Sequence, residues 1–133
     1  MQRDFDLILK ILEYFEQREE RNETSAVKEL EVEAYDQPLI EHHLKLMYQY
    51  GLLDAETVLD STTPEASLQN VFPLSLSWEG HAFYDLVRHK QIADKVKQSI
   101  GASRAEASYE FIKALAVGFE QEIFGKRVSP FKF

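Results

Sequence analysis

The sequence predicts a mainly helical α+β fold with one small β-hairpin. Apolar residues recur at helical spacing near both ends and in the middle of the chain. Between residues 52 and 76, two short apolar runs flank the turn-forming segment DSTTPEA at 60–66, which is typical of a hairpin. A chain of 133 residues with 44% hydrophobic residues is sufficient for one core.

Composition excludes several classes of protein. The chain has no cysteine, so it can form neither a disulfide framework nor a cysteine-containing zinc site. The first apolar stretch is interrupted by charged residues and lacks a small-residue cleavage site, so it reads as a helix and not a signal peptide. No run approaches the roughly 20 apolar residues that cross a bilayer. We therefore expect a cytoplasmic protein without membrane contact.

Charge is distributed unevenly along the chain. The net charge is −8, but residues 1–85 hold 18 acidic residues against 6 Lys or Arg, and residues 86–133 hold 5 against 9. No Lys or Arg lies between Lys45 and Arg88. Because nucleic acids are polyanions, only a few segments of this chain could meet a phosphate group.

The first half of the chain predicts two helices with a strand between them. The spacing of Phe5, Ile8, Leu12 and Phe15 predicts a helix from Asp4 to about Gln17. Alternation over residues 27–33 predicts a short, half-exposed strand. A second helix is expected over residues 37–50, with Asp36 as N-cap, Pro38 in the first turn and a stop at Gly51.

The second half predicts a hairpin followed by helices. Residues 52–59 and 71–76 form the expected strands, with Pro73 on an edge. Ser77 is expected to cap a helix that runs, bent or broken, to Gly101, and a last helix covers about 103–124. The predicted organisation is one domain over 1–101, a C-terminal helix at 102–125 that packs on it or dimerises, and a tail at 126–133.

Local motifs resemble those of winged-helix proteins. Residues 37–53 (QPLIEHHLKLMYQYGLL) resemble the recognition helix of the arsenic-responsive and related winged-helix repressors, and residues 76–80 (LSWEG) resemble the start of the helix after the wing. Together with RDFDLI at 3–8, HLKL at 43–46, WEGHAF at 78–83 and FIKALA at 111–116, the chain looks like domain-of-unknown-function family 2513. This resemblance implies a winged helix-turn-helix-like domain with a C-terminal helical extension, in a bacterial or prophage setting, and implies no mechanism.

The predicted recognition helix is the first candidate site. Its apolar side directs Ile40, Leu44 and Met47 to the core. The residues expected to face outward and contact DNA or a partner are Glu41, His42, Lys45, Tyr48 and Gln49. The candidates for phosphate contacts are Arg88, Lys90, Lys95 and Lys97.

Other polar and aromatic residues are assigned structural roles. His43 leans towards apolar neighbours and is expected to be buried and hydrogen-bonded. Trp78 and Phe83 are expected to pack at the junction between wing and helix. His81, Asp85 and His89 share one stripe of the expected helix at spacing that can hold zinc or nickel, but charged helix surfaces often show this spacing. No metal, cofactor or catalytic residue is therefore assigned.

The spacing of apolar residues in the last expected helix predicts a homodimer. Tyr109, Ile112, Ala116, Phe119 and Ile123 follow a 3-4-3-4 spacing that is typical of a helix-pairing seam. The alternative is that this stripe packs within the chain.

The sequence supports two hypotheses about function. The first is a non-catalytic DNA-binding regulator that uses residues 37–49, because helices in this position commonly read DNA. The second is a protein-interaction module that keeps the scaffold and does not bind DNA. The second is favoured by the net charge and by residues 54–76, which contain Asp54, Glu56, Asp60 and Glu65 but no Lys or Arg.

Overall fold

The first helix, α1, spans Phe5–Glu20 in the computed structural model, which describes residues 4–23, 25–27, 29–60, 67–103 and 108–125. Asp4 caps it, since its side chain accepts a hydrogen bond of 3.2 Å from the Leu7 N–H. The predicted apolar face is buried as expected: Phe5, Leu7, Ile8, Ile11, Leu12 and Phe15. The helix continues three residues past the predicted end at Gln17 and buries Arg18.

The predicted strand over residues 27–33 is wrong. In the described part of residues 21–36 the chain forms turns and bends, and neither a helix nor a strand. Leu30 is buried, and the Val27 N–H donates one hydrogen bond of 2.8 Å to the Pro73 carbonyl. Ala34 then adopts a positive φ of 73°, which is incompatible with continued extended pairing.

The second helix, α2, spans Gln37–Gln49, close to the predicted bounds. The Gly51 N–H donates to the Tyr48 carbonyl and the Leu52 N–H to the Met47 carbonyl, both at 2.9 Å. These bonds form a Schellman motif, whose glycine position requires a left-handed backbone. Gly51 has a φ of +80°, so the predicted glycine stop is confirmed.

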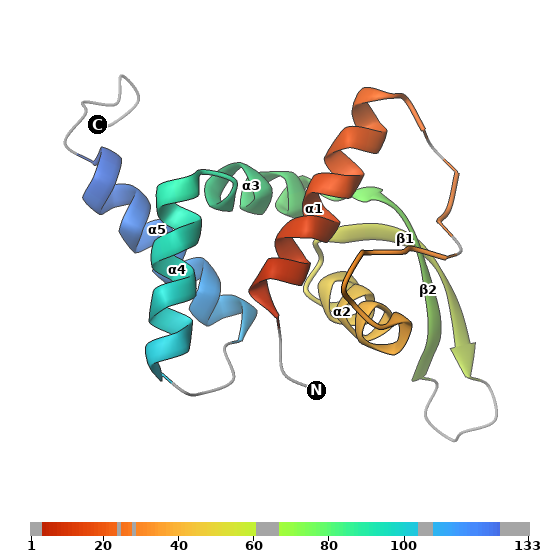
Figure 1. Ribbon diagram of the computed structural model, residues 1–133. Coiled ribbons are helices and arrows are strands. Elements are labelled where there is room, and N and C mark those ends of the chain that lie inside the picture. The colour runs from red at the N-terminus through yellow and green to blue at the C-terminus, as the bar shows by residue number, and fades with distance from the viewer. Residues whose placement is uncertain (1–3, 24, 28, 61–66, 104–107, 126–133) are drawn as a thin grey trace. The chain divides into compact units, whose positions relative to one another are not determined.

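The hairpin follows α2 directly. Strands β1 (Leu53–Asp60) and β2 (Ser67–Leu76) pair antiparallel, and β2 begins four residues before the predicted position. The register shifts between Asp54 and Ala55, which pair with Ser75 and Pro73 respectively, so Leu74 forms a bulge opposite no residue. Helices α1 and α2 pack against each other and against this hairpin (Figure 1).

Helix α3 spans Trp78–Val87 and starts at Ser77, whose hydroxyl accepts a hydrogen bond of 3.0 Å from the Gly80 N–H. The predicted N-cap is therefore confirmed. At Gly80 an added side chain would meet the Leu52 carbonyl, so this glycine permits the close approach of α3 to the end of α2. The chain leaves helical structure at residues 88 and 89 and resumes as α4, Lys90–Ser103.

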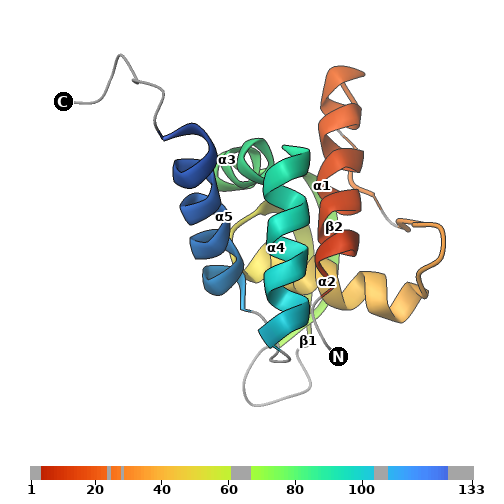
Figure 2. The ribbon, with the colours of Figure 1, turned by 60° about the vertical axis from the view of Figure 1, so that its left-hand side comes forward.

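The last helix, α5, spans Tyr109–Phe124 and is capped by Ser108, whose hydroxyl accepts a hydrogen bond of 3.1 Å from the Phe111 N–H. The predicted start near 103 is early, since Ser103 still belongs to α4. Helices α4 and α5 lie side by side and run in opposite directions (Figure 2). The predicted tail at 126–133 lies outside the described residues.

The predicted fold class is confirmed: the chain is mainly helical with one antiparallel hairpin. It forms two compact units, residues 1–84 and residues 85–133. The predicted boundary at residue 101 differs from this division, because α4 groups with α5 and not with the preceding elements. In the part of the chain that the structure describes, no helix has the length and apolarity needed to cross a membrane.

Candidate functional site

Helix α2 presents the predicted outward face, although not all of it is free. Ile40, Leu44 and Met47 are buried, as expected from the helical period. Of the predicted contact residues, Glu41 and Gln49 are exposed, whereas His42, Lys45 and Tyr48 are half-buried. Glu41 and Lys45 border a narrow cleft whose other walls include Val27, Leu30 and part of β2. The fully exposed part of this face is therefore at its two ends.

His43 is the buried histidine that the sequence predicts. Its side chain has no exposed surface. The Nδ1 atom lies 2.9 Å from the Leu39 carbonyl, and Nε2 lies 2.8 Å from the backbone N–H of Asp4. Since the Asp4 N–H donates, Nε2 accepts and Nδ1 carries the proton. His43 thus joins α2 to Asp4, the N-cap residue of α1.

Trp78 contradicts its predicted packing role. The side chain is 91% exposed, whereas Phe83, one turn and a half later, is 2% exposed and packs as predicted. Ala82, the residue before Phe83, is also exposed. The apolar stripe of α3 therefore starts at Phe83, and Trp78 lies at the exposed N-terminus of the helix.

The start of α3 is fixed to the end of α2. The Ser77 N–H donates a hydrogen bond of 3.0 Å to the Leu52 carbonyl, and the Ser77 hydroxyl donates to the Gly51 carbonyl. These bonds follow directly on the Schellman motif that ends α2. They hold Trp78 at the same corner of the first unit as the last turn of α2, which carries Tyr48 and Gln49.

The predicted phosphate contacts lie in the second unit, whereas Lys45 lies in the first. Lys95 has its ammonium 3.4 Å from a Glu122 carboxylate oxygen and 5.5 Å from the centre of the Phe119 ring. Arg88 is 4.0 Å from Asp85. Lys90 and Lys97 are exposed. Two of the predicted cations are therefore partly neutralised by neighbouring carboxylates.

The predicted seam of α5 is divided between buried and open positions. Ile112 and Ala116 are 2% and 0% exposed within the single chain, so they are not available to a second copy. Tyr109, Phe119 and Ile123 are half-buried. The open apolar side of the helix is a shallow groove beside the predicted seam. It is formed by Phe111, Ala114, Leu115, Gly118, Phe119 and Glu122. Homodimerisation stays a prediction, with this groove as its surface.

The predicted stripe of His81, Asp85 and His89 does not exist as one helix face, because α3 ends at Val87 and His89 lies beyond it. His89 contacts the Phe124 ring, with 4.7 Å between ring centres. His81 instead faces α1: its Nδ1 lies 3.2 Å from Glu16 Oε2 and its Nε2 lies 2.8 Å from Glu19 Oε2. Sequence reasoning missed this cluster because His81 lies more than 60 residues after the two glutamates.

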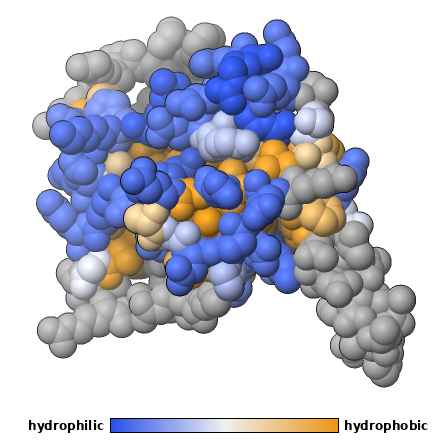
Figure 3. All heavy atoms as spheres, turned by 45° about the vertical axis from the view of Figure 1, so that its right-hand side comes forward, coloured by the Kyte–Doolittle hydropathy of each residue, from blue (hydrophilic) through white to orange (hydrophobic). Residues whose placement is uncertain are grey.

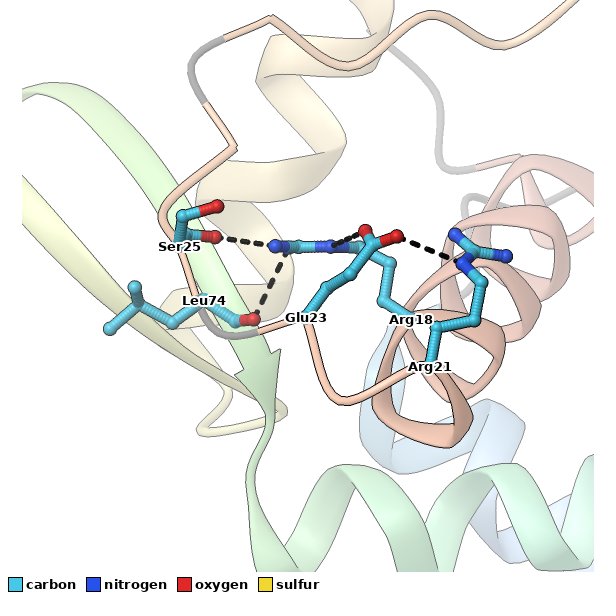
Figure 4. Close-up of polar contacts among 5 residues, drawn as sticks. All are labelled: Arg18, Arg21, Glu23, Ser25 and Leu74. Atoms are coloured by element: carbon cyan, nitrogen blue, oxygen red, sulfur yellow. Dashed lines mark hydrogen bonds and ion pairs between the residues drawn. The ribbon is translucent and has the colours of Figure 1, made fainter.

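Arg18 is a buried residue that the sequence analysis also missed. Its guanidinium donates to the Leu74 carbonyl at 3.3 Å, to the Ser25 carbonyl, and to Glu23 Oε2 at 3.3 Å (Figure 4). Glu23 Oε1 accepts a further bond of 2.9 Å from Arg21. Hydrogen bonds from Arg21 and then Arg18 lower the pKa of Glu23. The network fixes the turn after α1 to the bulge of β2.

This network borders a cavity of about 460 Å³ between the end of α1 and the base of the hairpin. Its walls include Phe15, Glu19, Asp54 and Ser75.

Figure 3 shows that hydrophilic side chains cover most of one face of the molecule, with an apolar band visible between them. Over residues 1–84 the sequence holds 17 acidic residues and 6 Lys or Arg, a net charge of −11.

Comparison with known proteins places the chain in a family. The family described as "Hypothetical protein (DUF2513)" matches residues 2–106. The chain belongs to this family. The region that matches the DUF2513 family covers residues 2–84 of the first unit and all of α3 and α4, and it ends before α5.

An "Uncharacterized protein" of Haemophilus influenzae (strain ATCC 51907 / DSM 11121 / KW20 / Rd) is 28% identical over 116 residues, which cover 87% of this chain and 92% of that protein. No solved structure matches the chain. The family membership thus confirms the predicted family.

Proposed function

We propose that this member of the DUF2513 family is a non-catalytic, cytoplasmic protein-interaction module on a winged-helix plan. The observation that carries the proposal is the 91% exposure of Trp78 at a corner fixed to the end of α2. Tryptophan is enriched among the residues that dominate the binding energy of protein interfaces. A large aromatic ring left in water at a rigid position is a surface that a partner can cover.

The order of elements supports the winged-helix plan. Helix α1, helix α2, the hairpin β1–β2 and helix α3 follow one another as a first helix, a recognition helix, a wing and a closing helix. The helix that normally precedes a recognition helix is missing, because the described part of residues 21–36 contains no helix. Without that helix, α2 lacks the element that crosses the DNA backbone in a helix-turn-helix.

Charge also favours a protein partner. The hairpin exposes Asp54 and Glu56, and α2 exposes Glu41. Bringing a unit of net charge −11 against a polyanion is opposed by repulsion over its whole surface. A protein with basic residues around an apolar pocket complements this surface, since opposite potentials steer association. The partner class is therefore a protein with a basic rim and a pocket for an indole ring.

Affinity enrichment from the native host tests the proposal. Wild-type protein, Trp78→Ser and the control Gln98→Ala are compared, because Gln98 is exposed in the second unit. A specific protein should be enriched by the wild type and the control and lost with Trp78→Ser. Loss of an interface anchor costs about 2 kcal/mol or more, roughly 30-fold in Kd. Equal enrichment by all three forms would contradict the role of Trp78.

DNA binding is the second candidate, supported by the position of α2 in the plan and by the exposed Lys90 and Lys97 of α4. Any such binding should be weak at physiological salt. Fluorescence anisotropy with duplex DNA at two salt concentrations, for wild type and for the triple substitution Lys45→Glu, Lys95→Glu and Lys97→Glu, tests it. Salt-sensitive binding that the triple substitution abolishes would establish DNA as the partner; no such binding would exclude it.

A further inference from the structure

The side chains of Glu16, Glu19 and His81 form a cluster on the first unit. The two glutamates are one turn apart on α1, and His81 projects from the first turns of α3. One ligand atom from each of the three residues lies within 4.8 Å of the others. Among the residues that the structure describes, this is the group of His, Asp and Glu side chains compact enough to surround one ion.

The positions of the two carboxylates around His81 favour a cation between the ring and an oxygen. Both ring nitrogens of His81 face a carboxylate oxygen, at 3.2 Å and 2.8 Å. A neutral imidazole carries one N–H, so one nitrogen would direct its lone pair at a negatively charged oxygen. Such a contact is repulsive unless a proton or a metal ion lies between the two atoms.

The surroundings of the Glu16 carboxylate favour a metal ion over a proton. Its Oε2 atom is shielded from solvent and has no hydrogen-bond partner, although His81 Nδ1 is 3.2 Å away. The His81 ring therefore does not donate a hydrogen bond to it in acceptable geometry. A shielded carboxylate oxygen without a hydrogen bond is costly in the folded state. A metal ion can coordinate Glu16 Oε2 without the donor geometry that a hydrogen bond from His81 requires.

We infer that Glu16, Glu19 and His81 bind a divalent transition-metal ion, for which Zn²⁺ is the best fit. Two carboxylates and a neutral imidazole supply a charge of −2 and one nitrogen ligand, and zinc takes nitrogen and carboxylate ligands. Mg²⁺ fits poorly because it prefers oxygen ligands throughout. Zinc with three protein ligands retains an open position for water.

Binding the ion needs a side-chain movement of Glu19. Ligands of a tetrahedral zinc at about 2.1 Å lie roughly 3.4 Å from one another, close to the 3.2 Å between His81 Nδ1 and Glu16 Oε2. An ion on Nδ1 leaves Nε2 facing away from it, so the Glu19 carboxylate, which now faces Nε2, must turn to reach the ion. His81 and Glu19 have side chains 35% and 54% exposed, so an ion can enter from solvent. Bound metal would link α1 to α3 near Trp78, which lies one turn before His81.

Calorimetric titration of the full chain without an affinity tag tests the site, after treatment with EDTA and its removal. ZnCl₂ should bind in one equivalent, and MgCl₂ at least about tenfold more weakly. Glu16→Gln and His81→Ala should each weaken Zn²⁺ binding at least about tenfold, because even residues beyond the ligands change affinity 10- to 100-fold.

The matched controls are Glu20→Gln on the same helix and His89→Ala, both at exposed positions outside the cluster. They should bind Zn²⁺ like the wild type. Absence of saturable binding, or equal affinity in all five proteins, would overturn the inference. If the site variants do not fold, nuclear magnetic resonance of the wild type decides. Co²⁺ should broaden the signals of residues 16–19 and 81 first, and broadening centred elsewhere would contradict the site.

Discussion

Two buried polar side chains connect elements that are distant in sequence. Arg18 is 3% exposed and joins the end of α1 to Leu74 in β2, and His43 is fully buried and joins α2 to Asp4. A buried polar group stabilises the fold only when its hydrogen bonds are made, and removing one partner leaves the other unsatisfied. Both residues therefore specify how the elements of the first unit pack.

Arg18→Met should lower the free energy of unfolding by about 2–3 kcal/mol, because hydrogen bonds from a charged group to the Ser25 and Leu74 carbonyls are lost. Arg21→Met is the control, since its partly exposed ion pair with Glu23 contributes little. Urea unfolding followed by circular dichroism measures both. Equal losses for the two variants would show that burial of Arg18 has no special role.

Acid should weaken the same network. Since the pKa of Glu23 is lowered in the folded state, its contribution to stability is present above the ordinary carboxyl range and is lost as the pH falls through the folded pKa. The difference in urea midpoint between wild type and Glu23→Gln should thus be constant near neutral pH and shrink in acid. A difference that grows on acidification would have the wrong sign.

Sequence reasoning identified some of these residues and missed others for physical reasons. The position of His43 among Leu39, Leu46 and Tyr50 predicted its burial. Arg18 follows Phe15 by three residues, so it lies on the buried stripe of α1. Its charge and its polar neighbours nevertheless indicated an exposed position. Trp78 was assigned a packing role at the junction between wing and helix on residue type, whereas its side chain in the first turn of α3 is exposed.

At the scale of elements, helices were predicted best because each has its own period and caps. The strand over 27–33 failed because alternation indicates only a half-buried surface, whereas a strand also needs a partner for successive hydrogen bonds. The described residues of this segment make one such bond to β2, from Val27 to Pro73. The break between α3 and α4 carries no glycine or proline and was placed only loosely by the sequence.

The end of α2 depends on Gly51. Gly51→Val should clearly lower the melting temperature, because a β-branched residue is strained at a φ of +80°. Open space surrounds the position, so the effect should come from the backbone and not from a clash. Gly101→Val is the control, since Gly101 has similar open space without a positive φ. An unchanged melting curve for Gly51→Val would contradict the requirement for a left-handed residue.

The groove of α5 provides the surface for the predicted homodimer. Phe111 is 37% exposed and lines this groove with Leu115 and Phe119. Light scattering at micromolar concentration should show twice the 15.5 kDa chain mass. Phe119→Glu should give the monomer mass with helicity retained, and Glu120→Gln, on the exposed side, should remain dimeric. A monomer at every concentration would exclude the dimer.

For the whole molecule, the sequence pattern predicted the class of fold more completely than it predicted the function. Apolar periodicity and turn residues were sufficient to predict a mainly helical chain with a hairpin. The observed units meet at residues 84 and 85 and the predicted boundary lies at 101, because α4 and α5 pair through contacts that no local pattern reveals. The sequence supports two hypotheses about function, since the features on which the proposed function rests, an exposed ring and surface charge, depend on the folded chain.

A photo-crosslinking residue at position 78 tests whether Trp78 lies in an interface with a protein partner, because it reports what touches this corner of the protein in the living cell. The protein is produced in a bacterial host with the crosslinker at position 78, or at the exposed control position 98. We expect a discrete crosslinked protein band from position 78 and none from position 98. Crosslinking to nucleic acid, or no difference between the two positions, would contradict it.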